Sequence, residues 1–318
     1  PPPPPPPPPS APAADKPTLS RSVIGEQFVT TSDGVRLHTC SVGTGNLALV
    51  LVHEFAGCGE SFDAQIHHFS RFYRVVTYNA RGYPPSDVPT SGSKYSQARA
   101  MDDLIAVMDA LKIKQAHLLG CSMGAYTVLH AALKHPERVA SVTLVGIGYA
   151  SDTNRRSEFA REARDLARLI ENDGLTKLAA TYGHGPARLQ LQAKDPYAFQ
   201  HFISSFQRRS KDGLGLTLRG VQAERPSIFS LEKQIRESRT PALLVCGDED
   251  EAALDANVWL KRTWPMAGLS VLPQSGHALN LEEPHALNDS VAAFLHRVDA
   301  GSWAPRDPRT SKAKAFSS

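Results

Sequence analysis

The sequence predicts an α/β fold in which helices cover both faces of a mostly parallel central sheet. Short runs of β-branched residues and leucine alternate with helical patterns over about 250 residues, which is typical of strands joined by crossover helices. Most of these runs are apolar at every position, as expected where a strand is buried on both sides. The alternation breaks once, between Gly146 and Arg239, which indicates a separate helical segment.

The expected strands follow one another regularly along the chain. Residues 35–42 alternate in the manner of a strand. Strands of the buried type are expected at residues 48–52, 74–78, 116–119, 141–145, 242–245 and 269–272. Helices are expected between them at residues 98–111, 125–134 and 284–297.

The break in the alternation contains charged amphipathic patterns, at residues 158–170 and 197–209, without a convincing strand. An insertion of helices at the carboxyl edge of the sheet is the simplest explanation. Because open α/β sheets bind ligands at this edge, the inserted helices would cover the ligand.

These patterns divide the chain into a core and its additions. We expect core segments at residues 22–149 and 236–299, separated by a helical cap at residues 150–235. Eleven of the 24 prolines fall within the first 20 residues, so residues 1–21 are expected to be a disordered, extended tail. Residues 300–318 have no apolar period, which predicts a second disordered tail, basic in charge.

Composition favours a globular protein. With 318 residues, 41% of them hydrophobic, the chain can form one large domain or two modest ones. It has no run of eighteen apolar residues and no signal-peptide pattern, so we expect neither a membrane span nor membrane partners. The two tails account for the net charge of +3, and the middle of the chain carries −1. Nucleic-acid binding therefore has little support.

No cofactor or metal is expected. The four cysteines, Cys40, Cys58, Cys121 and Cys246, lie far apart, which argues against a zinc site and against a disulfide framework. There is no glycine-rich dinucleotide or phosphate loop at a strand-to-helix turn. The expected location is the cytoplasm, and any upstream targeting segment would be absent from this chain. The sequence makes no prediction about the oligomeric state.

A candidate nucleophile stands in the segment Gly120-Cys121-Ser122-Met123-Gly124, which matches the G-x-S-x-G pattern. The match is weak by itself, but a predicted strand runs into it and a predicted helix follows it. In such a turn the serine must adopt a strained backbone conformation, and the glycines allow the chain to pass closely. Ser122 would lie at a helix N-terminus, which favours a developing negative charge. Cys121 is expected to pack beneath the turn.

A serine hydroxyl needs a base, and the base needs a carboxylate to orient it. His277 is the best-placed histidine because it follows the strand expected at residues 269–272, and the carboxyl ends of parallel strands share one crevice. Three carboxylates follow the strand expected at residues 242–245, those of Asp248, Asp250 and Asp255. The order of serine, acid and histidine matches that of the α/β hydrolases.

Taken as a set, the motifs between about residue 26 and residue 295 resemble those of the α/β-hydrolase superfamily, in its capped esterase, enol-lactonase and carbon-carbon hydrolase branch. The segment His53-Glu54-Phe55 resembles the family's oxyanion loop, and residues 79–87 resemble its Asp-x-Arg-Gly-x-Gly-x-Ser segment. Residues 247–250 resemble the acid loop, and residues 276–284 resemble the histidine loop with the helix that follows. The resemblance implies the α/β-hydrolase fold, with a helical cap inserted after its sixth strand.

The resemblance also implies individual roles. In the family the acid stands three residues after the glycine of its loop, which favours Asp250 over Asp248. If the oxyanion loop keeps its family course, the backbone N–H groups of Phe55 and Met123 would bind the oxyanion. Glu54 departs from the family's glycine, and its carboxylate would oppose the oxyanion if it pointed inward.

The expected function is hydrolysis of a small ester or lactone through an acyl-enzyme. Ser122 would attack the carbonyl, His277 would take and return the proton, and Asp250 would orient His277. A serine nucleophile argues against the dehalogenase and epoxide hydrolase branches, which use aspartate. An acyltransferase, a carbon-carbon bond hydrolase and a non-catalytic ligand-binding homologue stay open as alternatives. The expected partner is a small ester-like molecule.

Overall fold

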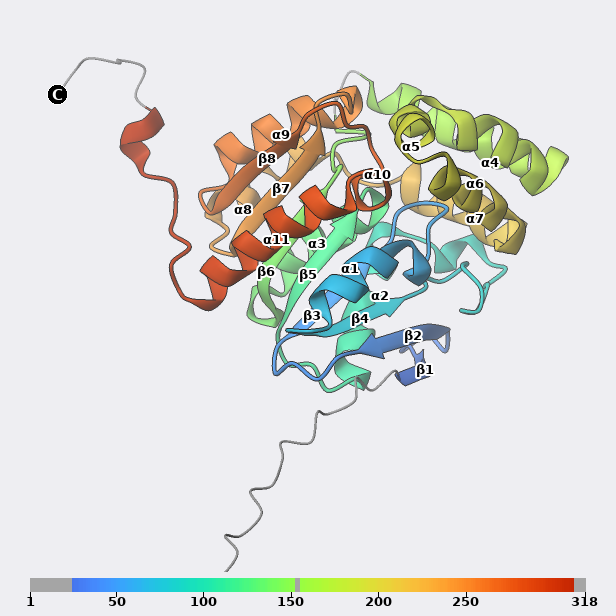
Figure 1. The fold of residues 1–318 in the computed structure, drawn as a ribbon. Helices are drawn as coiled ribbons and strands as arrows, with labels where there is room; N and C mark the ends of the chain where they lie inside the picture. The colour runs from blue at the N-terminus through green and yellow to red at the C-terminus, as the bar shows by residue number, and fades with distance from the viewer. Residues whose placement is uncertain (1–24, 152–154, 312–318) are drawn as a thin grey trace, which may run out of the picture.

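The computed structural model describes residues 25–151 and 155–311, and the tail expected at residues 1–21 lies outside them. Its centre is an eight-stranded sheet with the order β1-β2-β4-β3-β5-β6-β7-β8 (Figure 1). The strands are β1 (Gly25–Thr30), β2 (Arg36–Val42), β3 (Ala48–Val52), β4 (Arg74–Tyr78), β5 (Ala116–Cys121), β6 (Val139–Val145), β7 (Ala242–Gly247) and β8 (Ala267–Leu272). Strand β2 pairs antiparallel with both β1 and β4. The remaining neighbours, in the order β4-β3-β5-β6-β7-β8, pair parallel. The predicted mostly parallel sheet is confirmed.

Helices cover both faces of the sheet, as predicted. On one face α1 (Asp63–Phe69) and α11 (Pro284–Asp299) share a core with alternate residues of the central strands. On the other face lie α2 (Gln97–Ala110), α3 (Met123–Lys134), α8 (Glu232–Glu237) and α9 (Glu251–Thr263). Helix α10 (Leu279–Glu282) precedes α11.

A group of helices separates β6 from β7, and we call its described residues 155–231 the helical insertion. It contains α4 (Arg156–Thr181), α5 (Leu189–Lys194), α6 (Pro196–Ser205) and α7 (Lys211–Thr217), followed by a π-helix, Leu218–Gln222. Helix α4 bends at Gly174, whose φ of +79° is favourable for glycine. Figure 1 shows the insertion gathered at one end of the sheet. Its backbone touches the core closely, since a Cβ at Gly213 would lie 1.9 Å from the carbonyl oxygen of Gly82.

Single 3-10 turns complete the described secondary structure. They lie at Gly59–Phe62, Gly92–Lys94, Pro136–Arg138, Tyr182–His184, Pro186–Arg188, Phe206–Arg208, Ile228–Leu231 and Pro308–Ser311.

Residues after α11 differ from the disordered tail that the sequence predicts from residue 300. The Trp303 indole donates a hydrogen bond of 2.8 Å to the carbonyl oxygen of Met266 and packs against Phe294. The Arg306 N–H donates to the carbonyl oxygen of Pro265. One aromatic side chain thus supplies the apolar contact that a Ser- and Lys-rich segment otherwise lacks, and residues 312–318 lie outside the described part of the chain.

Candidate active site

Ser122 occupies a sharp turn between β5 and α3. Its φ of +49° and ψ of −110° lie outside the regions that side-chain-bearing residues favour, so the predicted backbone strain is confirmed. A Cβ at Gly120 would lie 2.2 Å from the Gly124 carbonyl oxygen, and one at Gly124 would lie 2.0 Å from that of Val52. Both glycines are therefore required by close backbone approach.

Cys121, next to Ser122, is buried with 4% of its surface exposed. It packs in the apolar core between the sheet and helices α1 and α11, as expected. Burial raises the pKa of its thiol well above the usual range, so the reactive thiolate is disfavoured.

His277 follows β8, and its imidazole contacts Asp250, which follows β7. The distance from His277 Nδ1 to Asp250 Oδ2 is 2.7 Å, with both side chains buried. An ionised carboxylate can only accept, so Nδ1 carries the proton and Nε2 is left as an acceptor. Burial would lower the pKa of His277, but the Asp250 carboxylate outweighs it and the pKa is raised.

The other two carboxylates that the sequence left open lie elsewhere. Asp248 is exposed and accepts a hydrogen bond of 3.1 Å from the backbone N–H of Ser275. Asp255 is exposed on α9. Asp250 is the one that the structure brings to His277.

A cavity of about 700 Å³ opens above Ser122 and His277. Phe55 also lines it, so three of the five predicted site residues share one cavity. Asp250 lies behind His277, and Met123 is the first residue of α3. The opposite wall comes from the helical insertion and is mostly apolar, with Phe159, Leu166, Leu169, Tyr182 and Leu218.

The loop after β3 is held in place by His53. The backbone N–H of Ala80 donates to His53 Nε2 at 3.0 Å, so the ring proton sits on Nδ1. Nδ1 then donates to the carbonyl oxygen of Glu54 at 2.7 Å. Burial lowers the pKa of His53 to about 4, which keeps this arrangement neutral.

The Glu54 carboxylate, the departure that could oppose an oxyanion, is paired with a side chain of the helical insertion. Its Oε2 lies 2.6 Å from Nη2 of Arg188, and both residues are buried. Arg209, also from the insertion, donates from Nε to the carbonyl oxygen of Ala56 at 3.0 Å. The insertion therefore neutralises this loop and anchors it.

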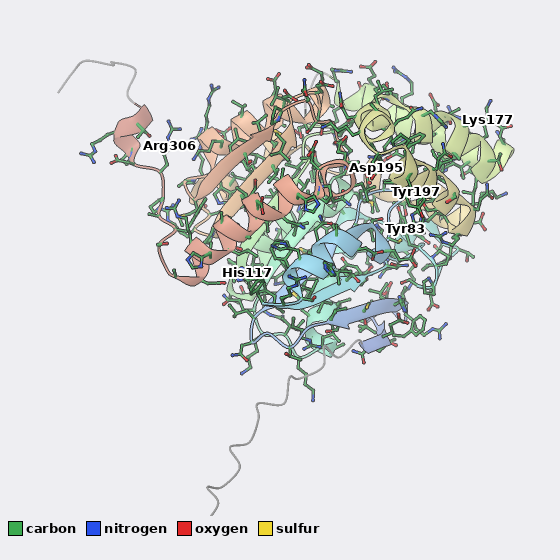
Figure 2. All side chains as sticks on the ribbon, viewed as in Figure 1. Tyr83, His117, Lys177, Asp195, Tyr197 and Arg306 are labelled. Atoms are coloured by element: carbon green, nitrogen blue, oxygen red, sulfur yellow. The ribbon has the colours of Figure 1, made fainter. Side chains whose placement is uncertain are left out.

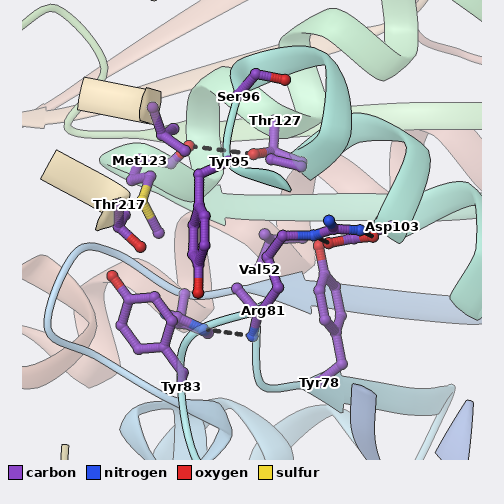
Figure 3. Close-up of a pocket in the computed structure, with 14 residues that line it drawn as sticks. Val52, Tyr78, Arg81, Tyr83, Tyr95, Ser96, Asp103, Met123, Thr127 and Thr217 are labelled. Carbon is purple, nitrogen blue, oxygen red and sulfur yellow. Dashed lines mark hydrogen bonds and ion pairs between the residues drawn. The ribbon is translucent and has the colours of Figure 1, made fainter. Parts of the chain in front are cut away.

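A second, much smaller void lies behind the same loop and is drawn in Figure 3. Arg81 forms a buried ion pair of 2.6 Å with Asp103 at its edge, and Tyr83, Tyr95 and Thr217 close it. Its volume of about 20 Å³ is enough for roughly one water molecule. It is too small for a substrate.

Asn79 and Pro84 stand where the family pattern Asp-x-Arg-Gly-x-Gly-x-Ser has its Asp and its second Gly, and they contact each other. Asn79 Nδ2 donates to the Pro84 carbonyl oxygen at 2.8 Å, while Oδ1 accepts from the Gly59 N–H at 2.9 Å. An ionised aspartate could only accept, so the amide is needed for both contacts.

Two residues near the site escaped the sequence analysis. The Tyr149 ring lies 4.8 Å from the His277 ring, and burial together with Asp250 raises the pKa of its hydroxyl. The signal for Tyr149 is its place shortly after β6, because the carboxyl ends of parallel strands share one crevice. Arg188 lies in the helical insertion, where no sequence pattern indicates a contact with Glu54.

Two features are absent from the described ranges, 25–151 and 155–311. No helix there combines the length and apolar character needed to cross a membrane. No group of three or more His, Cys, Asp or Glu side chains there could bind a metal ion.

Curated relatives cover most of the chain. A provisionally named 2-succinyl-6-hydroxy-2,4-cyclohexadiene-1-carboxylate synthase of Bacillus subtilis is 29% identical over 86% of this chain and 100% of its own length. A 2-hydroxymuconate semialdehyde hydrolase of Pseudomonas putida is 30% identical over 73% of this chain and 80% of its own.

A solved structure shares the fold. A thermophilic esterase from Thermogutta terrifontis superposes with a TM-score of 0.77, at 22% identity, over 86% of this chain and 99% of its own. The family model described as alpha/beta hydrolase fold matches residues 48–284. The predicted fold and family are therefore confirmed, and the chain is an enzyme of the α/β-hydrolase family.

Proposed function

We propose that this enzyme hydrolyses a small ester or lactone through an acyl-enzyme formed on Ser122. The observation that carries the proposal is the shared cavity of Ser122 and His277, with Asp250 at 2.7 Å on the far side of the imidazole. The strained turn at Ser122 supports it, because such strain is characteristic of functional sites.

In the proposed mechanism His277 Nε2 takes the hydroxyl proton of Ser122 while the Ser122 oxygen attacks the carbonyl carbon. The protonated imidazole is stabilised by Asp250 and then gives its proton to the leaving alcohol. Water repeats the sequence on the acyl-enzyme, which releases the acid and restores Ser122.

The oxyanion would be bound by the backbone N–H groups of Phe55 and Met123. The N–H groups of the first helical turn have no partner within their helix, so Met123 at the start of α3 has one to donate. Each such donor contributes about 3 kcal/mol to stabilising the transition state. Pairing of Glu54 with Arg188 supports this assignment, because it compensates the nearby negative charge.

The helical insertion would act as a cap, within the boundaries of residues 150–235 that the sequence predicts. Its apolar wall would exclude bulk water and strengthen the electrostatic interactions around Ser122. The four free cysteines, Cys40, Cys58, Cys121 and Cys246, favour a reducing compartment, and we place the enzyme in the cytoplasm.

Carbon-carbon bond hydrolysis is the second candidate, since the relative from Pseudomonas putida is named a 2-hydroxymuconate semialdehyde hydrolase. It would use the same three side chains. A panel of short and long esters, lactones and diketones, assayed with wild type and Ser122→Ala, separates the two candidates. We expect ester or lactone turnover that falls at least about 10⁴-fold in Ser122→Ala. Turnover confined to diketones would favour the second candidate, and equal turnover by the folded variant would refute both.

A further inference from the structure

The turn that carries Phe55 includes an unfavourable backbone conformation. The Gly57 N–H donates to the Glu54 carbonyl oxygen at 3.1 Å, which closes a turn over residues 54–57. Ala56, inside this turn, has a φ of +63°, a left-handed conformation that disfavours alanine. In the described part of the chain the Phe55 N–H has no backbone hydrogen-bond partner, which leaves it available as a donor. Strain of this kind persists only where surrounding contacts hold the backbone.

Arg209 of the helical insertion holds the strained residue. Its Nε donates to the Ala56 carbonyl oxygen at 3.0 Å, and its Nη2 donates to Cys58 Sγ at 3.2 Å. A longer contact of 3.5 Å joins Nη2 to the Ser205 hydroxyl. Arg209 is buried, with 8% of its surface exposed. These three acceptors are neutral, so they do not cancel the positive charge of Arg209.

Arg188 contacts the turn on the other side of Phe55. Its Nη2 lies 2.6 Å from Glu54 Oε2, and both side chains are buried. Two opposite charges this close together largely cancel each other's effect on a third group. The Phe55 ring itself packs edge-on against Tyr182 of the insertion, with 5.4 Å between the ring centroids. The insertion thus contacts residues 54, 55 and 56 in succession.

Both arginines lie behind the cavity wall. Pro186 and Ala187 line the cavity that contains Ser122, but neither Arg188 nor Arg209 is among its described lining residues. They therefore act on the loop after β3 rather than on a molecule in the cavity. Two arginines and one glutamate leave this loop with a net positive charge. Because buried charges are screened little, such a charge favours a negative charge that develops at the Phe55 N–H.

We propose that Arg188 and Arg209 are positioning residues of the oxyanion site. Arg209 fixes the backbone at Ala56, so that the Phe55 N–H keeps its direction into the cavity, and Arg188 cancels the charge of Glu54. The helical insertion then sets the rate of the chemical step, in addition to covering the substrate. The inference rests on the proposed function, because an oxyanion forms only if Ser122 attacks a carbonyl group.

Replacing Arg209 tests the hold on the backbone. With 4-nitrophenyl butyrate as substrate, Arg209→Met should lower kcat at least about tenfold and leave KM within about threefold, because a misdirected donor weakens the transition state more than the bound substrate. The matched control is Arg208→Met. Arg208 is the neighbouring residue and also joins the insertion to the core, through an exposed ion pair of 3.3 Å with Glu60. The control should keep the wild-type kcat, and an unchanged kcat in folded Arg209→Met would overturn the inference.

Replacing Arg188 tests the charge compensation. Arg188→Met leaves the buried Glu54 carboxylate without its partner, and kcat should again fall at least about tenfold. The double variant, Glu54→Gln with Arg188→Met, removes both charges, and its kcat should exceed that of Arg188→Met at least about tenfold. A double variant as slow as the single one would refute the compensation. If Arg188→Met does not fold, Arg209→Met and its control decide the inference, with the outcomes given above.

Amide hydrogen exchange separates this inference from the proposed function, because it needs no turnover. The Gly57 N–H, which closes the turn, should exchange with deuterium at least about tenfold faster in Arg209→Met than in wild type or Arg208→Met. Faster exchange in Arg209→Met, together with a wild type that hydrolyses no ester or lactone, would support the hold on the turn and refute the proposed function. Turnover by wild type, with unchanged kcat and unchanged exchange in folded Arg209→Met, would refute the positioning role alone.

Discussion

The described part of the molecule holds two Ser-His-Asp clusters, at opposite ends of β5. At the carboxyl end lie Ser122, His277 and Asp250, and at the other end lie Ser141, His117 and Asp299. In the second cluster the Ser141 hydroxyl is 2.8 Å from His117 Nδ1, and Asp299 is 2.9 Å from His117 Nε2. Figure 2 labels His117, at a distance from the helical insertion. We call these the cavity cluster and the core cluster.

The two clusters share their residue types but differ in geometry, since Asp250 contacts Nδ1 of its histidine and Asp299 contacts Nε2, and in their surroundings. Ser141 lies within the regular strand β6 and is 1% exposed, whereas Ser122 is half-buried and faces a cavity of about 700 Å³. Ser122 also stands at a helix N-terminus in a strained turn. We therefore expect the core cluster to be inactive, because catalysis also needs room for a carbonyl group and donors for its oxyanion.

The largest expected difference comes from replacing the two aspartates. Asp250→Asn should lower kcat about 10⁴-fold, because an amide favours the wrong tautomer of His277. Asp299→Asn should leave kcat within about twofold of wild type, since distant sites act independently, and should lower the melting temperature. Steady-state kinetics on one ester and thermal unfolding of both variants test this. Comparable losses of kcat from the two substitutions would contradict the distinction.

Each cluster also has a tyrosine against its histidine, which allows a finer comparison. The Tyr73 hydroxyl donates to Asp299 at 2.7 Å, and its ring lies 5.7 Å from that of His117, while Tyr149 packs on His277. Tyr149→Phe should lower kcat/KM about tenfold, because the Tyr149 hydroxyl forms a hydrogen bond with the Asp250 carboxylate that orients His277. Tyr73→Phe should cost about 1 kcal/mol of unfolding free energy and leave kcat/KM unchanged.

Kinetics and denaturant unfolding of these two variants provide the check. An equal loss of kcat/KM in Tyr73→Phe and Tyr149→Phe would contradict the proposed difference between the two clusters.

The smallest expected difference between the two clusters is in the pKa values of their histidines. The pKa of His277 is raised above its ordinary value of 6.5 because Asp250 outweighs burial, whereas burial lowers that of His117 despite Asp299. The stability that His277 contributes is thus present below about pH 6.5 and lost as pH rises through its folded pKa. The stability that His117 contributes is lost as pH falls below about 6.5 toward the pKa of His117 in the folded protein.

Histidine ring resonances followed by NMR should show one group titrating above pH 6.5 and affected by Asp250→Asn. Another should titrate below that value and respond to Asp299→Asn. The kcat/KM should rise with pH until His277 is neutral, since the base must be unprotonated. The reverse order of the two titrations would rule out the electrostatic difference that we describe.

Local patterns were enough to predict the central strands and the turn at Ser122. Runs such as residues 48–52 are apolar throughout, and the glycines at positions 120 and 124 mark the close backbone approach. Strand β1 was missed because it is an edge strand with mostly exposed residues. The choice of Asp250 among three carboxylates depended on the family resemblance, since only the fold brings β7 and β8 side by side.

The contacts of the helical insertion could not be predicted in this way. Arg188 and Arg225 look alike in the sequence, yet one meets Glu54 and the other meets aromatic rings. The contacts of both arginines depend on how the insertion packs on the core, which no local sequence pattern predicts. The sequence signal for the core cluster is the polar His117 within an otherwise apolar strand.

The most direct test of the account is the site of covalent labelling by an alkyl fluorophosphonate, which forms a stable adduct with an activated serine. Intact-mass measurement should show one adduct on wild type and on Ser141→Ala, and peptide mapping should place it on Ser122. Ser122→Ala, confirmed as folded by circular dichroism, should gain no mass. An adduct that persists in Ser122→Ala, or a folded wild type that is not labelled, would contradict the assignment of Ser122 as the nucleophile.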